Sequence, residues 1–350
     1  MPKMISIDAL QNICEQALCR AGMNREHAKI TADVLSETDA YGTHSHGTKN
    51  LFNYIKKIRE GGINIEAVPE VLRETPAIAV MDGKDAIGMV SAYQAMALAI
   101  QKASVCGVSC VTVRNGCHFG AAGYYANMAA KQGMIGISLS NVDANMTVPG
   151  AKGKVMGNNP LAYAVPAGKY HSVFLDIAMS SVASLKVVQA KRDKRSIPDN
   201  WIVDADGLPT TDPSRYPEEG AMQPMSAHKG YGLAMMVELL TGVMSGGGIM
   251  KDVPSWLFCM PEKNNTSYTF IVLDVAQFMD LPEYVARVED VVERLHSTPK
   301  AAGATRIYYP GEMEWERVIK AEESGITLPD DVVEQLELLG REFNLSINWA

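Results

Sequence analysis

The feature that most constrains the fold of this chain is a change in the spacing of its apolar residues near residue 75. Before that point, apolar residues recur every three to four positions over 6–22, after Asn24 and after Ser45, as on amphipathic helices. Beyond it, short aliphatic runs such as Ala77–Met81 alternate with helix-like segments. This pattern predicts a helical start followed by a mixed α/β region.

The later segments extend this prediction. Strands are expected at 77–81, 108–113, 134–140, 161–166, 172–176 and 268–273, and helices at 90–105, 120–132 and 230–245. The Pro- and Asp-rich residues 191–226 predict a long excursion, and helices at 282–298, 313–323 and 329–342 close the chain. We therefore expect an α/β fold with a mixed sheet in a central region, 76–281. The helices of 1–75 and 282–350 are expected to pack together as one layer.

Composition excludes several classes of protein. Apolar residues make up 47% of the chain and charged residues 21%, which suffices for a sizeable core. A net charge of −8 without a basic stripe argues against nucleic acid. The sequence has no apolar run of membrane-span length, no signal peptide and no CxxC pair among its six cysteines. These features predict a cytoplasmic protein with reduced thiols that acts on small molecules.

The segment Tyr41–Lys49 contains His44, Ser45 and His46 between two expected helices. Ser45 is predicted to cap the second helix, with His46 in its first turn. A helix N-terminus favours an anion such as a carboxylate and disfavours imidazolium. The alternative is a capped helix start with two surface histidines, and the residues alone favour neither.

Metal binding by this segment is not expected. Histidines at i and i+2 point in different directions at a helix start, and no further ligands have local spacing. A zinc hydrolase using His44, His46 and His118 is therefore only a remote alternative.

Other candidates lie where expected strands or helices meet loops. His118 and Asp143 follow expected strands, in loops where catalytic side chains often lie, although a buried structural histidine and a turn-forming aspartate are the alternatives. Lys229 opens a helix, where a cation opposes the dipole unless the site binds an anion such as pyrophosphate. No GxGxxG motif follows a strand, so a Rossmann dinucleotide site is not indicated.

Six motifs occur in order along the chain: His44–Gly47, Asn115–His118, Gly157–Pro160, Asp176–Ala178, Lys229–Gly232 and Tyr309–Gly311. Together they resemble the malate/L-lactate dehydrogenase-like family of the non-Rossmann type. Ser196–Trp201 and Leu208–Pro213 look most like its ureidoglycolate and malate branch.

The resemblance implies an NAD(P)-dependent enzyme that transfers hydride between a 2-hydroxy acid and its 2-oxo acid, in a homodimer. NAD is the expected cofactor, with NADP as the alternative. By position, the residues implied to bind the cofactor are Val142, Asp176, Ile177, Ala178, His228, Lys229, Gly311 and Glu312.

His118 and His46 match the two histidines that face the substrate in the family. We expect His118 to be the general base, because an imidazole neutral near pH 7 can accept the hydroxyl proton. His46 and Ser45 would hold the carboxylate, and Tyr54 and Asp143 would face the substrate.

One position departs from the family pattern. Many relatives carry arginine where this chain has Asn50, so the usual bidentate carboxylate clamp is weakened or is supplied by another residue such as Lys49. This favours a smaller, less charged or amide-bearing acid over malate. A cyclic imino-acid reductase on the same fold is the second reading.

Overall fold

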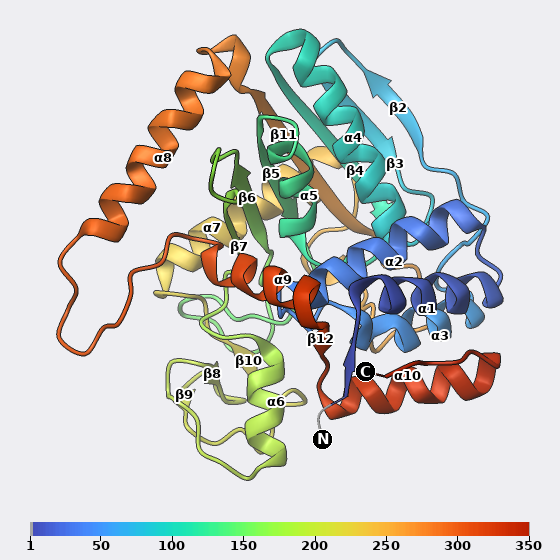
Figure 1. The fold of residues 1–350 in the computed structure, drawn as a ribbon. Helices are drawn as coiled ribbons and strands as arrows, with labels where there is room; N and C mark the ends of the chain where they lie inside the picture. The colour runs from blue at the N-terminus through green and yellow to red at the C-terminus, as the bar shows by residue number, and fades with distance from the viewer. Residues whose placement is uncertain (1–2, 350) are drawn as a thin grey trace.

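A computed structural model describes residues 3–349 and is organised around a seven-stranded sheet (Figure 1). The strand order is β2-β3-β4-β11-β5-β6-β7. The bounds are β2 Glu70–Glu74, β3 Ile78–Asp82, β4 Val108–Gly116, β5 Met134–Ser140, β6 Leu161–Val165, β7 Val173–Ile177 and β11 Thr266–Asp274. The predicted α/β class with a mixed central sheet is confirmed.

Strand directions place several loops at one edge of the sheet. β3 and β4 are parallel, whereas β11 is antiparallel to both β4 and β5. β5, β6 and β7 are successively antiparallel. Consequently β3, β4, β5 and β7 run in the same direction, and their carboxyl ends meet the N-terminal end of β11.

Helices cover both faces of this sheet. α4 (Gly88–Cys106) packs on β4 and β11, and α5 (Ala122–Ala130) packs on β5 and β6. α7 (His228–Glu238), continued by the π-helical turn Leu239–Val243, lies on the opposite face (Figure 1). The result is a three-layer arrangement of helices, sheet and helix.

The two ends of the chain lie together. β1 (Met4–Ile5) pairs with β12 (Ile326–Thr327), and α10 (Asp330–Phe343) packs beside α1 (Ile7–Arg20) and α3 (Leu51–Arg59). α2 (Arg25–Ala40) and α9 (Glu312–Ser324) also pack together, and Figure 1 shows all five helices in one region.

The division at residues 75 and 281 stays a prediction. β2 lies in the predicted helical region but pairs with β3, whereas α8 (Leu281–Ser297) stands apart from the N-terminal helices beside the sheet (Figure 1).

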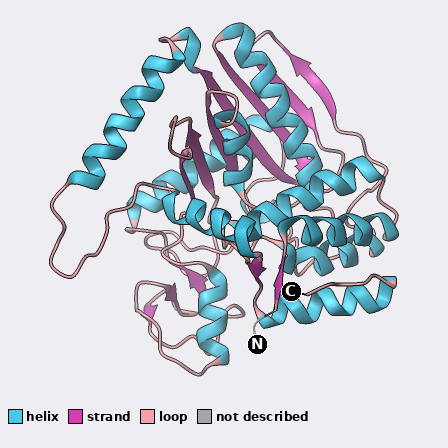
Figure 2. Cartoon of the chain, viewed as in Figure 1, coloured by secondary structure: helices cyan, strands magenta, loops and turns pink. Residues whose placement is uncertain are grey.

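The predicted excursion contains a small separate unit. α6 (Ser184–Arg192) stands beside a three-stranded sheet in the order β10-β8-β9 (Figure 2). Its strands are β8 Ile202–Val203, β9 Pro209–Thr210 and β10 Ala221–Met222. Among residues 3–349, no helix is long and apolar enough to cross a membrane.

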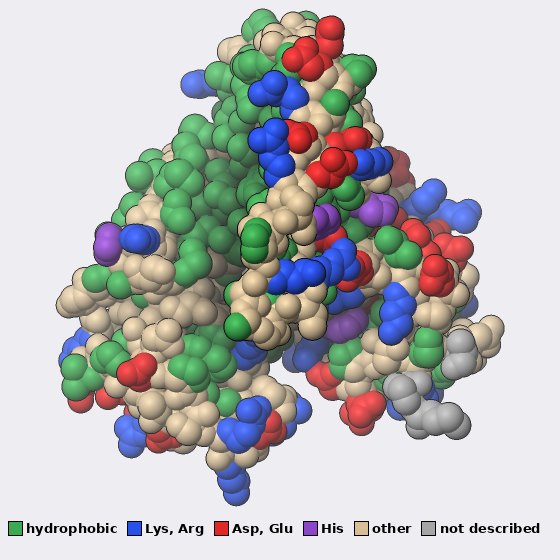
Figure 3. Space-filling view, turned by 60° about the vertical axis from the view of Figure 1, so that its left-hand side comes forward, with side chains coloured by type: hydrophobic (Ala, Val, Ile, Leu, Met, Phe, Trp, Pro, Cys, Tyr) green, Lys and Arg blue, Asp and Glu red, His purple; other side chains and the backbone are tan. Residues whose placement is uncertain are grey.

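The helix expected at 230–245 has an apolar face that is exposed over most of its length. Val237 is buried, but Leu233, Met236 and Met244 are 39%, 37% and 44% exposed. Leu239 and Val243 extend this exposed apolar surface, and Figure 3 shows hydrophobic side chains gathered over much of one side of the molecule. Periodicity identified an apolar face but did not indicate what covers it.

Candidate active site

The sheet edge described above gathers the candidate residues. His118 follows β4, Val142 and Asp143 follow β5, and Asp176 lies at the end of β7. Because these three strands run in the same direction, their carboxyl ends present these residues at one edge. The loop that enters β11 from the other direction reaches the same edge.

The predicted helix start at Ser45 is wrong. Residues 43–47 form a turn, a 3₁₀ turn follows at Thr48–Asn50, and α3 begins at Leu51. The carboxylate of Asp39 accepts from the Thr48 backbone N–H at 2.8 Å and from its hydroxyl at 2.6 Å. The Thr48 donors at this turn are therefore already bound by Asp39. They do not form the helix N-terminus at which a substrate carboxylate was expected to bind.

His44 and His46 point to different partners. His44 Nδ1 lies 2.7 Å from the same Asp39 carboxylate, whereas His46 Nδ1 lies 2.8 Å from Ser45 Oγ. Among residues 3–349, no group of three or more His, Cys, Asp or Glu side chains could hold a metal ion. The three histidines of the zinc alternative do not form a ligand set.

His118 lies at the centre of a stacked group. Its ring centroid is 5.6 Å from that of His46 and 4.3 Å from that of Trp256, with interplanar angles of 29° and 15°. Tyr54, a fully buried residue of α3, places its hydroxyl 2.5 Å from His118 Nδ1. We call His46, Tyr54, His118 and Trp256 the histidine cluster.

Burial keeps the ionisable members of this cluster neutral. Desolvation lowers the pKa of His46, and desolvation together with the neighbouring His46 lowers the pKa of His118 well below its usual value. Desolvation raises the pKa of Tyr54 well above its usual value. Both imidazoles are therefore uncharged near pH 7, as a general base requires.

The hydrogen bond to Tyr54 leaves one imidazole nitrogen of His118 for other partners. Nδ1 faces the tyrosine hydroxyl, and the Gly120 N–H lies 3.5 Å from the same nitrogen. Within the described chain, Nε2 of His118 has no hydrogen bond to protein. Nε2 is therefore the nitrogen open to a ligand, and it accepts a proton in the tautomer that carries the ring hydrogen on Nδ1.

Asp143 reaches this group indirectly. Burial raises the pKa of its carboxyl, and a hydrogen bond with Ser255 partly opposes the rise. Ser255 immediately precedes Trp256, the residue stacked on His118. Asp143 and His118 are therefore connected through Ser255 and Trp256, two consecutive residues of the loop before β11.

Asn50 and Lys49 both have partners within the protein. The Asn50 side chain is 7% exposed and donates to the Ser45 carbonyl at 2.8 Å, so it stabilises the turn that carries His46. Lys49 forms an ion pair with Asp331 of α10 at 2.6 Å. Neither side chain replaces the arginine clamp in this arrangement.

The predicted cofactor residues surround the end of β7. The Asp176 carboxylate accepts from the Gly123 N–H in the first turn of α5 at 2.7 Å. Desolvation raises the pKa of Asp176 to about 6, and the hydrogen bond from Gly123 opposes the rise. Because α5 begins shortly after His118, this bond connects the histidine cluster to β7.

Backbone hydrogen bonds hold the start of α7 next to the end of β7. Met225 N donates to Met179 O at 2.8 Å, and Gly230 N donates to Met225 O at 2.8 Å. A Cβ on Gly230 would lie 2.4 Å from Met225 O, so only glycine permits this approach. His228 and Lys229 are exposed at the start of this helix, which lies against the Met179 backbone just after β7.

The turn before α9 completes this region. Phe174 N donates to Pro310 O at 3.0 Å, and a Cβ on Gly311 would lie 2.4 Å from the Phe174 ring. Glu312 is buried and accepts from Tyr309 N at 3.0 Å, from His296 Nε2 at 3.0 Å and from Arg306. Its carboxylate thus holds the turn.

The Val142 loop is fastened by a buried polar network. Val142 N donates to Asn159 Oδ1 at 3.2 Å, and Asn159 Nδ2 donates to Glu238 of α7 at 2.7 Å. Glu238 also accepts from Met250 N at 2.7 Å. We call the region containing Val142, Asp176–Ala178, His228, Lys229 and Gly311 the cofactor region.

Sequence reasoning missed Trp256, Asp39 and the Asn159–Glu238 pair. The sequence around Trp256 contains no motif that connects it with His118. Asp39 had a weak signal, since an acidic residue ends a helix just before a histidine-rich turn. Asn159 lay within a recognised motif, but its partner on α7 requires the tertiary structure.

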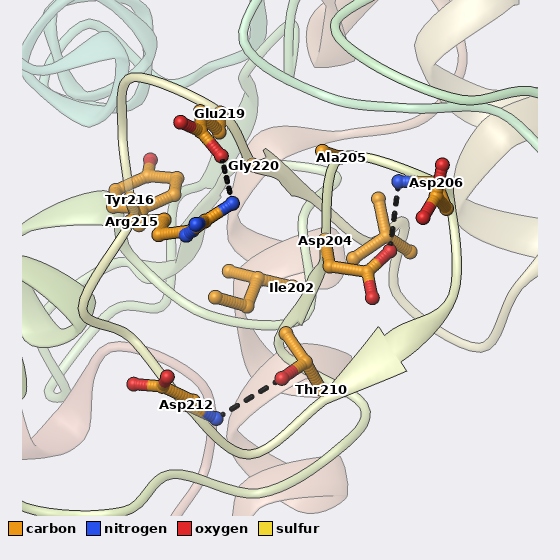
Figure 4. A pocket seen from close by; sticks show the side chains of 11 residues that line it. Ile202, Asp204, Ala205, Asp206, Thr210, Asp212, Arg215, Tyr216, Glu219 and Gly220 are labelled. Carbon is orange, nitrogen blue, oxygen red and sulfur yellow. Dashed lines mark hydrogen bonds and ion pairs between the residues drawn. The ribbon is translucent and has the colours of Figure 1, made fainter.

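A separate pocket lies in the small sheet, lined by residues between Ile202 and Gly220 (Figure 4). Its carboxylates are used locally: Asp204 accepts from Asp206 N at 2.9 Å, and Glu219 pairs with Arg215 at 2.6 Å. None of the predicted site residues lines it, so it is not part of the candidate active site.

Comparisons with known proteins identify the family of this chain. Residues 5–337 match the family model described as malate/L-lactate dehydrogenase. The chain is 34% identical to malate/(S)-sulfolactate dehydrogenase of Methanothermus fervidus, covering 99% of this chain and 100% of the relative. It is 35% identical to ureidoglycolate dehydrogenase (NAD(+)) of Escherichia coli strain K12, covering 95% and 94%.

A solved structure shares the fold throughout. Sulfolactate dehydrogenase from Methanocaldococcus jannaschii superposes with a TM-score of 0.91 at 35% identity, covering 98% of each chain. A further relative, 29% identical and covering 95% of each chain, is a Δ¹-pyrroline-2-carboxylate/Δ¹-piperideine-2-carboxylate reductase of Pseudomonas putida. The chain belongs to the malate/L-lactate dehydrogenase family.

Proposed function

We propose that this protein is an NAD(P)-dependent dehydrogenase that interconverts a small 2-hydroxy acid and its 2-oxo acid. The observation that carries the proposal is the hydrogen bond between Tyr54 and His118 Nδ1, which leaves Nε2 of a neutral imidazole free at the sheet edge. Family membership and the named activities of the relatives support the same reaction class.

The proposed chemistry assigns proton transfer to His118. Nε2 takes the hydroxyl proton of the substrate while hydride leaves the adjacent carbon, and in the reverse direction the same nitrogen returns the proton. Tyr54 fixes the ring through Nδ1, and the Trp256 ring restricts water on the stacked face. His46 and Ser45 are placed to face the substrate beside His118.

The cofactor region fits a nicotinamide dinucleotide by its donor set and its glycines. Lys229 is an exposed cation at the start of α7, suited to a phosphate group, and Gly230 and Gly311 allow close backbone approach. When bound, the nicotinamide ring would accept or supply the hydride. Asp176, Ile177, Ala178, Val142 and His228 would line its binding site, and Glu312 would hold the adjoining turn. NAD is favoured because the ureidoglycolate relative is named for NAD(+).

The substrate is proposed to be a small 2-hydroxy acid without a second carboxylate bound at Asn50. The amide of Asn50 is used by Ser45 O, and Lys49 is paired with Asp331. No cation contributes to the pKa shifts of His46 or His118. An amide-bearing or short-chain acid therefore fits this side of the site better than a dicarboxylate.

We further propose a cytoplasmic homodimer. Leu239 and Val243 are 50% and 52% exposed on the π-helical turn that continues α7, and Val291 on α8 is 56% exposed. Apolar surface of this kind is typical of an oligomer interface. A second copy covering these helices would account for an apolar face that the chain leaves open (Figure 3).

A spectrophotometric screen tests the proposed function. NAD and NADP are each offered with a panel of 2-hydroxy acids, and NADH and NADPH with the matching 2-oxo acids and with cyclic imino acids. Turnover on a hydroxy/oxo acid pair supports the proposal. Turnover restricted to cyclic imino acids would replace it with the reductase reading, and no turnover on any acid or imine would contradict both.

A further inference from the structure

A buried lysine lies one turn after Tyr54 on α3, away from the residues assigned above. Lys57 is 0% exposed, and its ammonium donates to Cys259 O at 2.9 Å, Met260 O at 3.2 Å and Glu262 O at 2.7 Å. Three acceptors use all three N–H groups of an ammonium. Among residues 3–349, no carboxylate lies within ion-pair distance of it.

Such an arrangement is costly to build. Removing a lysine ammonium from water carries a large desolvation penalty, which neutral carbonyl groups offset only in part. Desolvation lowers the pKa of Lys57, and the ionisable groups that face it are Cys117, Cys259, Lys263 and Glu262. A methionine of similar size would fill the space without that penalty, so hydrophobic packing does not explain the choice of lysine.

The three carbonyls belong to the loop that carries Trp256. Asn264 ties the two ends of this loop together, because its amide donates to Pro254 O at 2.9 Å and its oxygen accepts from Cys117 Sγ at 2.9 Å. Between these ends, Ser255 bonds Asp143 and Trp256 stacks on His118 at 4.3 Å. Lys57 is thus one of two α3 contacts of a loop that touches two candidate site residues, the other being Tyr54, whose ring lies 5.2 Å from that of Trp256.

A glycine allows the loop to come this close. A Cβ on Gly62 would lie 2.0 Å from Met260 O, and 2.9 Å from the Lys57 ammonium. A side chain at position 62 would therefore push the loop away from α3. The loop position depends on Lys57 and on the absence of a side chain at Gly62.

We propose that Lys57 is a positioning residue that holds the Pro254–Asn264 loop against α3, so that Trp256 stays stacked on His118. The inference rests on the proposed function for its effect on turnover. Helix α3 then fixes His118 from two sides: Tyr54 bonds its Nδ1, and Lys57 holds the loop whose Trp256 covers its face.

The test uses Lys57→Met in the full chain, with Lys56→Met as the matched control. Lys56 is the neighbouring exposed lysine of α3, 3.8 Å from Glu60. Lys57→Met is expected to accelerate backbone hydrogen exchange in residues 254–264 selectively and to lower kcat by about ten- to hundredfold, because small displacements at an active site have effects of this size. The KM for the nicotinamide cofactor should change less than twofold.

A double-mutant cycle with Trp256→Ala shows whether the effect passes through the tryptophan. In that background, Lys57→Met should change kcat by less than about twofold. Full multiplication of the two effects, or a Lys57→Met enzyme with wild-type kcat, would overturn the proposal.

Two further measurements apply if Lys57→Met does not fold or if the wild-type protein is inactive. If Lys57→Met does not fold, Gly62→Ala displaces the same loop with the lysine intact and should give the same exchange pattern and loss of kcat; unchanged exchange in 254–264 would overturn the proposal. Wild-type protein that turns over no acid would refute the proposed function. Hydrogen exchange in Lys57→Met would still decide whether Lys57 holds the loop.

Discussion

The histidine cluster and the cofactor region lie at the same sheet edge but are built differently. The histidine cluster is closed: Tyr54 is fully buried, and the His118 ring is stacked between His46 and Trp256. The cofactor region is open, with Asp176, His228 and Lys229 exposed and an uncovered apolar helix face on the same α7. A single chain therefore orients the imidazole proposed as proton acceptor in advance, whereas the surface proposed for the cofactor remains accessible for ligand and partner.

We expect substitutions in the histidine cluster to change kcat, and substitutions in the cofactor region to change cofactor affinity. His118→Ala should lower kcat by about a hundred- to ten-thousandfold, because it removes the general base. NADH affinity, measured by fluorescence titration, should stay within about twofold, since no part of the cofactor region contacts Nε2. The exposed His171 provides the control substitution. An equal loss of NADH affinity would show that the two regions are not separable.

Lys229→Ala should give the opposite result. Loss of a charge-assisted hydrogen bond of about 1.5–3 kcal/mol corresponds to a weakening of NADH binding by about ten- to hundredfold. At saturating cofactor, kcat should change little. Lys186→Ala, which removes an exposed lysine of α6, is the control. Wild-type NADH affinity in Lys229→Ala would remove Lys229 from the proposed site.

Tyr54→Phe tests how rigid the closed region is. The substitution keeps the ring that stacks near Trp256 but deletes the hydroxyl 2.5 Å from His118 Nδ1. Losing one hydrogen bond worth about 1 kcal/mol should lower kcat by about fivefold. Steady-state kinetics compared with Tyr308→Phe, at an exposed tyrosine, measure the effect. An unchanged kcat would mean that packing alone orients His118.

The pH dependence of oxidation tests the burial of the same imidazole. The folded pKa of His118 is lowered, so the base stays neutral as the pH falls below 6.5 and loses activity only at more acidic pH. The neutral fraction of an unperturbed histidine would fall about threefold between pH 7 and pH 6.0. The predicted kcat/KM at pH 6.0 is therefore close to its value at pH 7. An acid limb centred at or above 6.5 would contradict the proposed environment of His118.

The free energy of unfolding should also decrease as the pH falls, because of the lowered pKa of His118. The unfolded chain binds a proton at His118 below about pH 6.5, whereas the folded chain does not until lower pH. The contribution of this group to stability is complete above 6.5 and declines as the pH falls toward the folded pKa.

Local patterns predicted the parts of the fold that depend on local interactions. Strand 134–140 occurs as β5, and the helix expected after Asn24 occurs as α2, capped by Asn24, which accepts from His27 N at 2.9 Å. β2 was not predicted, because its residues Glu70–Glu74 are exposed and charged and its pairing with β3 is a tertiary contact. Ser45 was misplaced because Asp39, a side chain from the preceding helix, satisfies the donors of the turn.

The candidate site divides in the same way. His46, Tyr54 and His118 come together as expected from family motifs, although their catalytic roles stay predictions. Trp256 and Lys57 could not have been identified beforehand, since they act through a loop that is distant in sequence from the strand end it covers. Where a residue bonds only across the fold, as Asn159 bonds Glu238, sequence spacing contains no information about the partner.

The proposed reaction requires direct hydride transfer at the histidine cluster. The most direct measurement uses a 2-hydroxy acid substrate, identified in the screen, with deuterium at C2, and follows the label by NMR of the reduced nicotinamide. We expect deuterium at C4 of the nicotinamide and a primary isotope effect on the chemical step, with label transfer slowed by about a hundred- to ten-thousandfold in His118→Ala. Deuterium released to solvent, with none on the nicotinamide, would contradict it.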